Sequence, residues 1–297
     1  MTSLARYAWL SIAAALTTMA LKGIAAWLTG SVGLLSDALE SFVNLGAALL
    51  ALWILRVSLV PPDAKHPFGY SKAEYFSAVV EGALIIVAAV AIIATALPRL
   101  LEPRPIESFG AGLVISLAAT AINLGVALVL LRASKEHHSV ALEADAHHLL
   151  TDVWTSIGIV LGVGAIALTG WLILDPLVAL AVAVYIVWTG VGVIRRSVLG
   201  LMDSSLPEGE VEKIRQILES YKARGMDFHA LRTRHAGRRR LVELHLLLPG
   251  AMTVLEGHRV ADEVEERIRA ALPGCAVLTH LEPIEDPASY KDQELFR

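Results

Sequence analysis

Six long apolar blocks in the first two hundred residues constrain the fold more than any other feature of the sequence. A helix needs about 20 apolar residues to cross a bilayer. The windows that qualify are about 7–28, 33–55, 76–98, 109–132, 141–169 and 171–193. The first is too long for a simple signal peptide and is followed by five more, which favours a true span. We therefore predict an α-helical membrane protein with six transmembrane helices.

Charge is distributed unevenly along the 297 residues, of which 55% are hydrophobic and 18% charged. The charged residues gather after position 203, which predicts a transmembrane transport domain at 1–203, a cytoplasmic domain at 204–290 and a disordered tail at 291–297. A net charge of −4 without a basic run excludes a nucleic-acid-binding protein. The single Cys275 excludes an internal disulfide and any metal site built from several thiolates.

The segment after position 204 has the pattern of a small α/β domain. Amphipathic helices are predicted at 208–222 and 253–272, and strands at 227–235, 239–248 and 275–282. This order predicts a small αββαβ domain with an open sheet.

Lys and Arg in the short loops predict the orientation of the membrane domain. They gather on one side, at Arg6, in the loop 56–72, near Arg132 and in the tail, whereas the other side has only Arg99 and Arg104. We predict a multi-pass protein of the cell (inner) membrane whose N- and C-termini are both cytoplasmic.

Polar residues follow the same spacing in the second and fifth spans. In each, an Asp is followed three residues later by a residue of a metal-ligand type and by another four residues after that. On a helix these offsets fall on a single stripe. The residues are Asp37, Glu40 and Asn44 in the second span, and Asp145, His148 and Asp152 in the fifth.

Two facing pairs, Glu40 with Asn44 and His148 with Asp152, would form a site of one nitrogen and three oxygens. Such a site suits Zn²⁺, Cd²⁺, Fe²⁺, Co²⁺ or Mn²⁺ rather than Cu⁺. One alternative is that these residues only form interhelical hydrogen bonds. Another is that a carboxylate pairs with a basic residue, but neither span has a Lys or Arg near these stripes. We predict a metal transport site at the four residues.

Other polar residues of the spans have open roles. Asp37 and Asp145 are predicted either as accessory ligands or as hydrogen-bonding residues. Glu81 in the third span and Asn123 in the fourth are predicted to hydrate a cavity or to hold helices together.

Histidines lie on four predicted elements of the tail, with a carboxylate beside the last. They are His229, His245, His258, His280 and the neighbouring Glu282. One histidine on each of four elements predicts a regulatory metal site. The alternative is that these are scattered surface histidines. His235, beside the turn, is predicted to be a bystander.

These residues resemble the cation diffusion facilitator family over nearly the whole chain. The resemblance is carried by Gly30-Ser31-Val32, the loop 63–74, the run 143–152 and the tail segment 231–234 with its histidines. The family implies a homodimer of six-span protomers with metallochaperone-like cytoplasmic domains. It also implies export of a divalent metal in exchange for protons, by alternating access.

The sequence departs from the family at three positions of the membrane domain. The family usually has Asp or His where Glu40 stands and Asp where Asn44 stands, so the site has two formal negative charges instead of three. Asp63 and His66 match an accessory metal site of relatives, but Tyr70 replaces its second His, which predicts a weak or absent site.

The resemblance also implies a structural charge pair, Lys72 with Asp203, near a dimer interface. In the tail it matches His229, His245, His258 and His280 to zinc-binding positions, with Glu282 in place of Asp.

We predict a secondary active transporter, not an enzyme, that exports Zn²⁺, and also Cd²⁺, Fe²⁺ or Co²⁺, in exchange for protons. Zn²⁺ would be both the transported ion and the regulatory one, and the partners would be protons, the lipid bilayer and a second copy of the chain. The alternatives are an exporter that prefers Mn²⁺ and a membrane metal sensor that does not transport. An intramembrane enzyme is disfavoured because no H-E-x-x-H motif is present.

Overall fold

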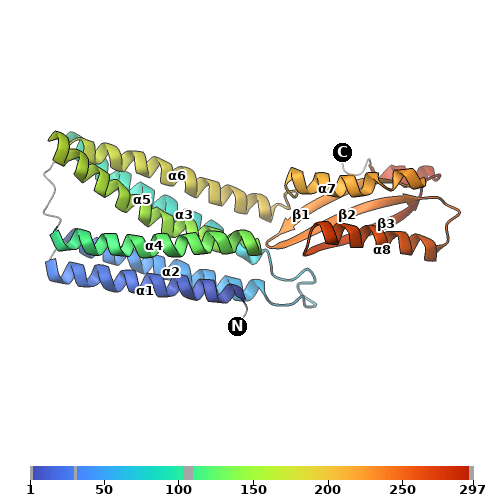
Figure 1. The fold of residues 1–297 in the computed structure, drawn as a ribbon, viewed down its shortest axis with the longest axis horizontal. Coiled ribbons are helices and arrows are strands. Elements are labelled where there is room, and N and C mark those ends of the chain that lie inside the picture. Colours follow the sequence, from blue (N-terminus) through green and yellow to red (C-terminus); the bar gives the residue numbers. More distant parts are fainter. Residues whose placement is uncertain (1–2, 30–31, 103–109, 294–297) are drawn as a thin grey trace. The chain divides into compact units, whose positions relative to one another are not determined.

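The structure is a computed structural model that describes residues 3–29, 32–102 and 110–293, without the side chains of some helical residues, among them 32–40. It divides into two compact units, residues 1–198 and 199–297. The first unit is a bundle of six long helices and the second is an α/β domain (Figure 1).

The six helices of the first unit match the six predicted spans. They are α1 (Ser3–Thr29), α2 (Val32–Ser58), α3 (Ala73–Leu101), α4 (Gly110–His137), α5 (Val140–Thr169) and α6 (Leu174–Leu201). Over their described residues, four of them are long and apolar enough to cross a membrane, namely α1, α3, α4 and α6. Helix α2 contributes the shorter apolar stretch Asn44–Ser58, and α5 has the predicted metal ligands in its first half.

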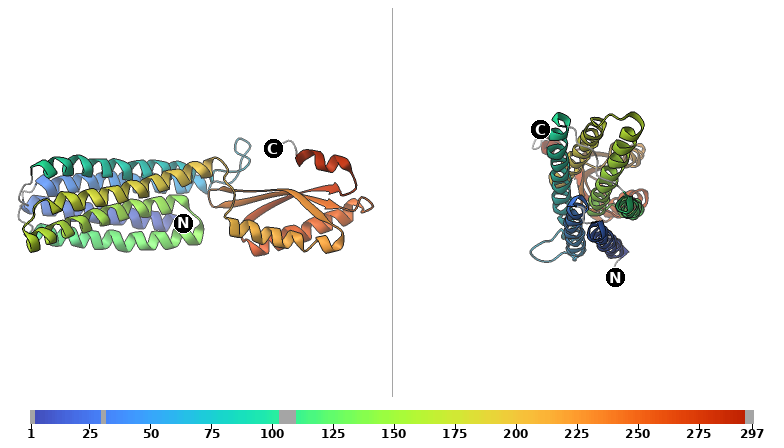
Figure 2. Two further views of the ribbon diagram at one scale, coloured as in Figure 1. Left: turned by 90° about the horizontal axis from the view of Figure 1, so that it is seen from above. Right: turned by 90° about the vertical axis from the view of Figure 1, so that its left-hand side faces the viewer.

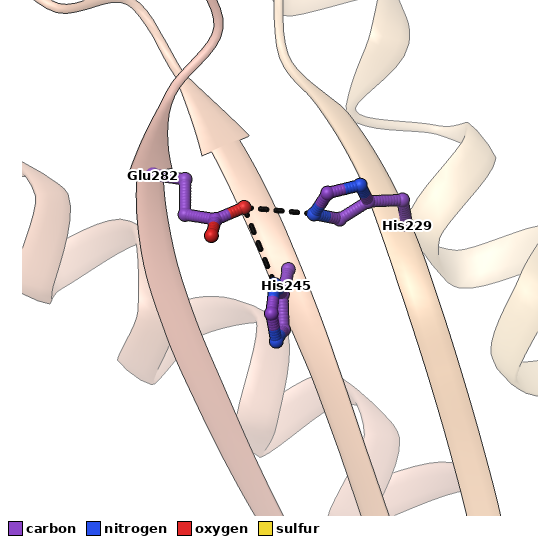
Figure 3. A group of neighbouring side chains, drawn as sticks. All are labelled: His229, His245 and Glu282. Atoms are coloured by element: carbon purple, nitrogen blue, oxygen red, sulfur yellow. Dashed lines mark hydrogen bonds and ion pairs between the residues drawn. The ribbon is translucent and has the colours of Figure 1, made fainter. Parts of the chain in front are cut away.

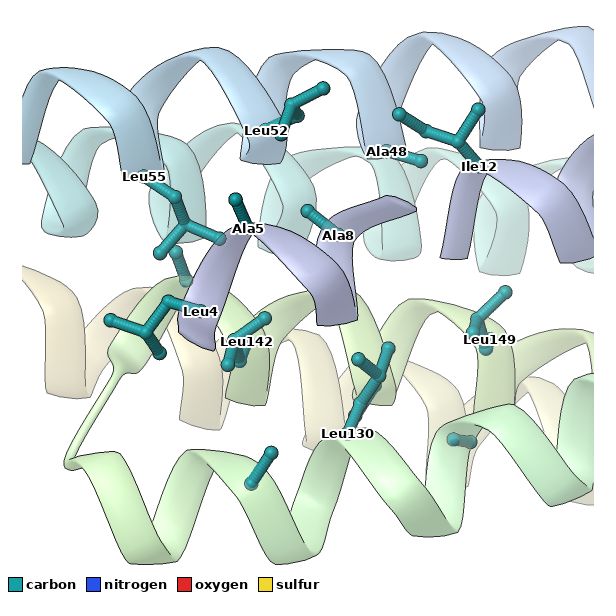
Figure 4. Close-up of a cluster of buried hydrophobic side chains, with 14 residues drawn as sticks. Leu4, Ala5, Ala8, Ile12, Ala48, Leu52, Leu55, Leu130, Leu142 and Leu149 are labelled. Atoms are coloured by element: carbon teal, nitrogen blue, oxygen red, sulfur yellow. The ribbon is translucent and has the colours of Figure 1, made fainter. Parts of the chain in front are cut away.

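The core of the bundle is built from small and medium apolar side chains of α1, α2, α4 and α5 (Figure 4). Alanines let the backbones approach, and leucines fill the space that remains. The labelled residues of this cluster are Leu4, Ala5, Ala8, Ile12, Ala48, Leu52, Leu55, Leu130, Leu142 and Leu149. Large apolar side chains also cover the outside, among them Trp27, Trp53, Val87 and Trp188, as expected of a surface that contacts lipid.

A buried carboxylate ties together three helices at one end of the bundle. Glu74, at the start of α3, is fully buried. Ser58 Oγ, at the end of α2, donates to Glu74 Oε1 at 3.1 Å, and Ser139 Oγ, just before α5, donates to Oε2 at 2.6 Å. These bonds fix the axial positions of α2, α3 and α5 relative to one another.

The second unit confirms the predicted αββαβ order. Its elements are α7 (Glu208–Glu219), the short 3₁₀ turn η1 (Lys222–Arg224), β1 (Asp227–Ala236), β2 (Arg239–Leu248), α8 (Val254–Ala271), β3 (Cys275–Pro283) and the terminal 3₁₀ segment η2 (Pro287–Gln293). A capping box starts α8, in which the Thr253 side chain accepts from the Glu256 backbone N–H and Glu256 reciprocates.

The sheet has the order β1-β2-β3, with β1 antiparallel and β3 parallel to β2. Both helices pack on one face (Figure 2). The core there joins Val242, Leu244 and Leu246 of β2 to Ile214 of α7 and Val264 of α8. Because strand residues alternate between faces, the odd-numbered residues of β2, His245 among them, belong to the opposite face.

Helices α3 and α6 cross with their backbones in close contact. A Cβ on Gly190 would lie 3.1 Å from the carbonyl oxygen of Gly82 and 2.9 Å from Ile86 Cγ1. Gly192 is two residues further along and so lies on the opposite face of the same helix, where a Cβ would meet nothing within 4 Å. The crossing therefore depends on the missing side chain at Gly190.

We expect Gly190→Val to destabilise the membrane domain by about 1–3 kcal/mol through overpacking. Thermal unfolding of the detergent-solubilised protein would measure this, with Gly192→Val as the matched control of unchanged stability. Equal effects of the two substitutions would contradict the close α3–α6 crossing.

Candidate metal sites

Three of the four residues predicted for the transport site form one hydrogen-bonded group in the helical bundle. Asn44 Nδ2, from α2, donates to Asp152 Oδ2, from α5, at 2.5 Å. Asn44 Oδ1 lies 2.8 Å from His148 Nε2. All three side chains are buried, so α2 and α5 meet here through polar groups removed from solvent.

The direction of these bonds determines which lone pair His148 keeps. Since the amide nitrogen of Asn44 donates to Asp152, its oxygen must accept, and Nε2 of His148 must therefore carry the proton. The Nδ1 atom is then an acceptor, and it is buried without a hydrogen-bond partner among the described residues. A neutral imidazole with an unused lone pair is the form of histidine that binds Zn²⁺.

The structure adds a residue that the sequence did not single out as part of the site. Asn123 Nδ2, from α4, donates to Asp152 Oδ2 at 3.0 Å, and its own Oδ1 is buried without a partner in the described part of the chain. Asn123 was predicted to hydrate a cavity or hold helices together, and its bond to Asp152 does hold α4 against α5. Its only signal in the sequence is a polar side chain within an apolar span.

The remaining predicted ligands of the membrane domain lie elsewhere or outside the described side chains. Those of Asp37 and Glu40 fall in the segment whose side chains are not described, so both stay predictions. Asp145 is buried and accepts a hydrogen bond at 3.1 Å from Ser11 Oγ of α1, and the structure does not join it to the group around Asp152.

A second cluster lies on the face of the tail-domain sheet opposite α7 and α8 (Figure 3). Glu282 Oε2, from β3, lies 2.7 Å from His229 Nε2 and 3.2 Å from His245 Nδ1. Ligand atoms of these three residues all lie within 4.8 Å of one another. His280 Nε2 is 3.6 Å from the other oxygen, Oε1. Imidazoles around a carboxylate are a ligand set that fits Zn²⁺.

Strand register explains why these residues meet. His229 of β1 pairs with His245 of β2, and His245 pairs with His280 of β3. The ring centroids of neighbouring histidines are 4.9 Å apart in both pairs. Directly after His229, β1 has a bulge in which Ala230 adopts φ of 48°, and a bulge of this kind reorients the side chains beside it.

Within the protomer the structure does not bring His258 to this cluster. It lies on α8, which packs against the opposite face of the sheet, and its Nε2 is 3.4 Å from Asp262 Oδ2 on the exposed side of the helix. The sequence placed one His on each element but could not show which face of the sheet α8 covers.

The loop residues Asp63 and His66 form a hydrogen-bonded turn. Asp63 Oδ1 accepts from the backbone N–H groups of Lys65 and His66, and Oδ2 accepts from Tyr70 Oη at 2.7 Å. The Tyr70 hydrogen bond is the main reason that the pKa of Asp63 is lowered from its ordinary value. The carboxylate is thus engaged within the loop, and metal binding there stays a prediction.

The predicted charge pair belongs to two different units. Lys72 immediately precedes α3 in the first unit, whereas Asp203 lies in the second, where Arg234 Nη1 is 3.3 Å from its Oδ1. The pairing of Lys72 with Asp203 stays a prediction.

Comparisons with known proteins identify the chain's family. Residues 8–202 match the cation efflux transmembrane domain, and residues 206–284 match the cytoplasmic domain of cation efflux proteins. The chain belongs to the cation diffusion facilitator family. Members of this family are transporters rather than enzymes, so the buried polar group of the bundle belongs to a cation efflux protein.

Two sequence relatives in this family match almost the whole chain, and a solved structure matches part of it. The uncharacterized transporter sll1263 of Synechocystis is 49% identical over 98% of this chain and 94% of its own length. The cation-efflux pump FieF of Pectobacterium atrosepticum is 33% identical over 92% of this chain and 90% of its own. The solved structure of CzrB in its zinc form is 41% identical, covers 27% of this chain and 92% of its own, and has a TM-score of 0.26.

We expect Zn²⁺ to stabilise the tail domain of this cation diffusion facilitator through the imidazole–carboxylate cluster. An ion at about 100 times its Kd would add about 2.7 kcal/mol to the free energy of unfolding. His245→Ala should abolish this gain, because His245 is the central residue of the cluster, while His235→Ala should retain it. Thermal unfolding with and without Zn²⁺ measures both. Undiminished stabilisation of the His245→Ala variant would contradict the site.

We also expect Tyr70→His to create a metal site in the loop, because it places a third ligand type next to Asp63 and His66. The rings of residues 66 and 70 already lie 4.3 Å apart, centroid to centroid. Equilibrium dialysis with Zn²⁺ should then show one additional ion per protomer. Tyr70→Phe is the control: it removes the hydrogen bond that lowers the pKa of Asp63 but adds no ligand. An unchanged count in Tyr70→His would refute the expectation.

Proposed function

We propose that the protein is a secondary active transporter that exports a divalent cation, with Zn²⁺ as its main substrate, in exchange for protons. The observation that carries this proposal is the buried group of Asn44, His148 and Asp152, joined across α2 and α5 in the membrane domain. Ionisable side chains at such positions are costly and mark ion pathways. A metal sensor would need only the tail cluster.

The ligand chemistry favours Zn²⁺ among divalent ions. His148 contributes an imidazole nitrogen, and Asp152, Asn44 and Glu40 contribute oxygens, a mixed set that Zn²⁺ accepts in tetrahedral geometry. Cd²⁺, Fe²⁺ and Co²⁺ accept similar sets. Mn²⁺ prefers oxygen ligands throughout, and three of the four ligands are oxygens. An exporter that prefers Mn²⁺ is the second candidate because only the His148 nitrogen disfavours it.

Exchange for protons follows from competition at the same atoms. A metal ion needs the free lone pair of His148 and the ionised carboxylate of Asp152, and protons occupy the same positions when the ion leaves. In the described structure His148 and Asp152 are bridged by the Asn44 amide. Binding of an ion would break these bonds and change how α2 and α5 meet, which couples occupancy to alternating access.

We assign the tail cluster a regulatory role. In this proposal Zn²⁺ is held by His229, His245, His280 and Glu282 in a homodimer, with both termini cytoplasmic in the inner membrane. Because the ligands lie on β1, β2 and β3, a bound ion would link the three strands and stabilise the folded domain. Export as the direction agrees with the relatives named cation-efflux pumps.

The proposal is tested by metal flux into inside-out or reconstituted vesicles with an imposed pH gradient, using Zn²⁺, Cd²⁺, Fe²⁺, Co²⁺ and Mn²⁺ in parallel. We expect Zn²⁺ flux that requires the gradient and falls by about 100-fold in Asp152→Asn, since a ligand charge is lost. Asp227→Asn, which changes an exposed carboxylate of β1, is the matched control with normal flux.

Each alternative has its own outcome. Flux of Mn²⁺ in place of Zn²⁺ would retain the transporter and replace the metal. Flux insensitive to the gradient would refute proton exchange, and metal binding without flux of any ion would favour the sensor.

A further inference from the structure

A second pair of acidic side chains lies inside the bundle, apart from the group around Asp152. Glu81 of α3 is fully buried and Asp145 of α5 is 1% exposed. Ser77 Oγ donates to Glu81 Oε1 at 2.9 Å, and Ser11 Oγ donates to Asp145 Oδ1 at 3.1 Å. The other oxygen of each carboxyl group, Glu81 Oε2 and Asp145 Oδ2, is buried without a hydrogen-bond partner among the described residues.

The two carboxyl groups belong to one region of the bundle. Helices α3 and α5 pack against each other here, with Ala78 and Ala144 in a common cluster with Val193 of α6. Neither group is joined to a Lys, Arg or His side chain in the described part of the chain. Two buried carboxyl groups in such surroundings are neutralised either by protons or by a cation that both of them bind.

The shared anchor at Glu74 gives the axial position of this pair. Glu81 is seven residues beyond Glu74, and Asp145 is six beyond Ser139, so both lie about 10 Å along the bundle from the anchor. Asp152 is thirteen residues beyond Ser139, and Asn44 is fourteen before Ser58, which places both about 20 Å from it. The acidic pair therefore lies about midway between the anchored helix ends and the transport site.

We infer that Glu81 and Asp145 form a second divalent-cation site, an oxygen-only station through which the ion passes between the anchored end of the bundle and the transport site. This inference rests on the transport function proposed above, and it adds an ion site to that pathway. The two unpartnered oxygens are its ligands, and the Ser77 and Ser11 hydroxyls orient the two carboxyl groups.

Charge and ligand type identify the ion. The pair has two formal negative charges, which one divalent ion neutralises. The ligands are carboxylate oxygens without nitrogen or sulfur, a set that suits hard ions and admits Mn²⁺ as readily as Zn²⁺. Such a station would bind less selectively than the site at His148, so it delivers ions and leaves the choice of metal to the transport site.

Counting bound Mn²⁺ tests the station, because free Mn²⁺ in water gives an electron paramagnetic resonance signal that coordination by protein broadens. The full-length protein in detergent is titrated as Asp152→Asn, with and without Glu81→Gln. We expect Glu81→Gln to remove one bound Mn²⁺ per protomer in this background. Glu136→Gln, which changes an exposed carboxylate of α4 outside the pair, is the matched control that keeps the ion.

Vesicle flux then separates this inference from the transport function. At low Zn²⁺, the flux of the Glu81→Gln variant should be about tenfold lower than that of the wild type. At saturating Zn²⁺ the two fluxes should be equal, since only delivery of the ion is impaired. An unchanged number of bound Mn²⁺ ions in Glu81→Gln would overturn the proposed ion site. If that variant also changed the pH dependence of flux, the pair would be a proton site instead. Normal wild-type flux that is lost in Asp152→Asn would still uphold the transport function.

Discussion

The amide of Asn44 is the contact on which the membrane domain depends, because it bonds to His148 and Asp152 at once. Polar side chains inside a bundle that lipid surrounds must find partners within the protein. A single amide provides both a donor and an acceptor, so it satisfies a carboxylate and an imidazole of the neighbouring helix. The same side chains are the proposed metal ligands. An ion would take the Asp152 and Asn44 oxygens from their hydrogen bonds and use the free Nδ1 of His148, so packing and ion binding compete for these oxygens and give the bundle two alternative arrangements.

The sequence predicted this group because helical spacing places Asn44 opposite two ligand types four residues apart in α5. It could not predict the bond from Asn123 to Asp152, since a lone Asn in an apolar span does not reveal which way it faces. The anchor at Glu74 was not predicted for a similar reason. Its partners, Ser58 and Ser139, are distant in the chain and meet it only once the helices are in register.

The tail domain shows the same division between local pattern and tertiary placement. Apolar periodicity predicted its two helices and three strands, and alternation along β3 placed His280 and Glu282 on one face. The register between strands aligns His229, His245 and His280. Between β1 and β2 this register changes at the bulge that contains Ala230, for which no Gly or Pro gives a signal. His258 was predicted to join the cluster, but it lies on α8, on the other side of the sheet. The side that α8 covers is determined by the core that α8 shares with the sheet, and no residue near His258 indicates it.

Asn44 also explains how a departure from the family pattern can suit a transporter. A carboxylate at this position would face that of Asp152, and two buried anions at hydrogen-bond distance require a proton or an ion at all times. The amide instead donates to Asp152 and accepts from His148, so without metal the carboxylate and imidazole side chains are joined by hydrogen bonds rather than by an ion. Glu40 and Asp152 together would still neutralise one divalent ion. The weaker ligand thus lowers the stability of the metal-bound state relative to the metal-free one, which favours release, and a transporter must release its ion as well as bind it.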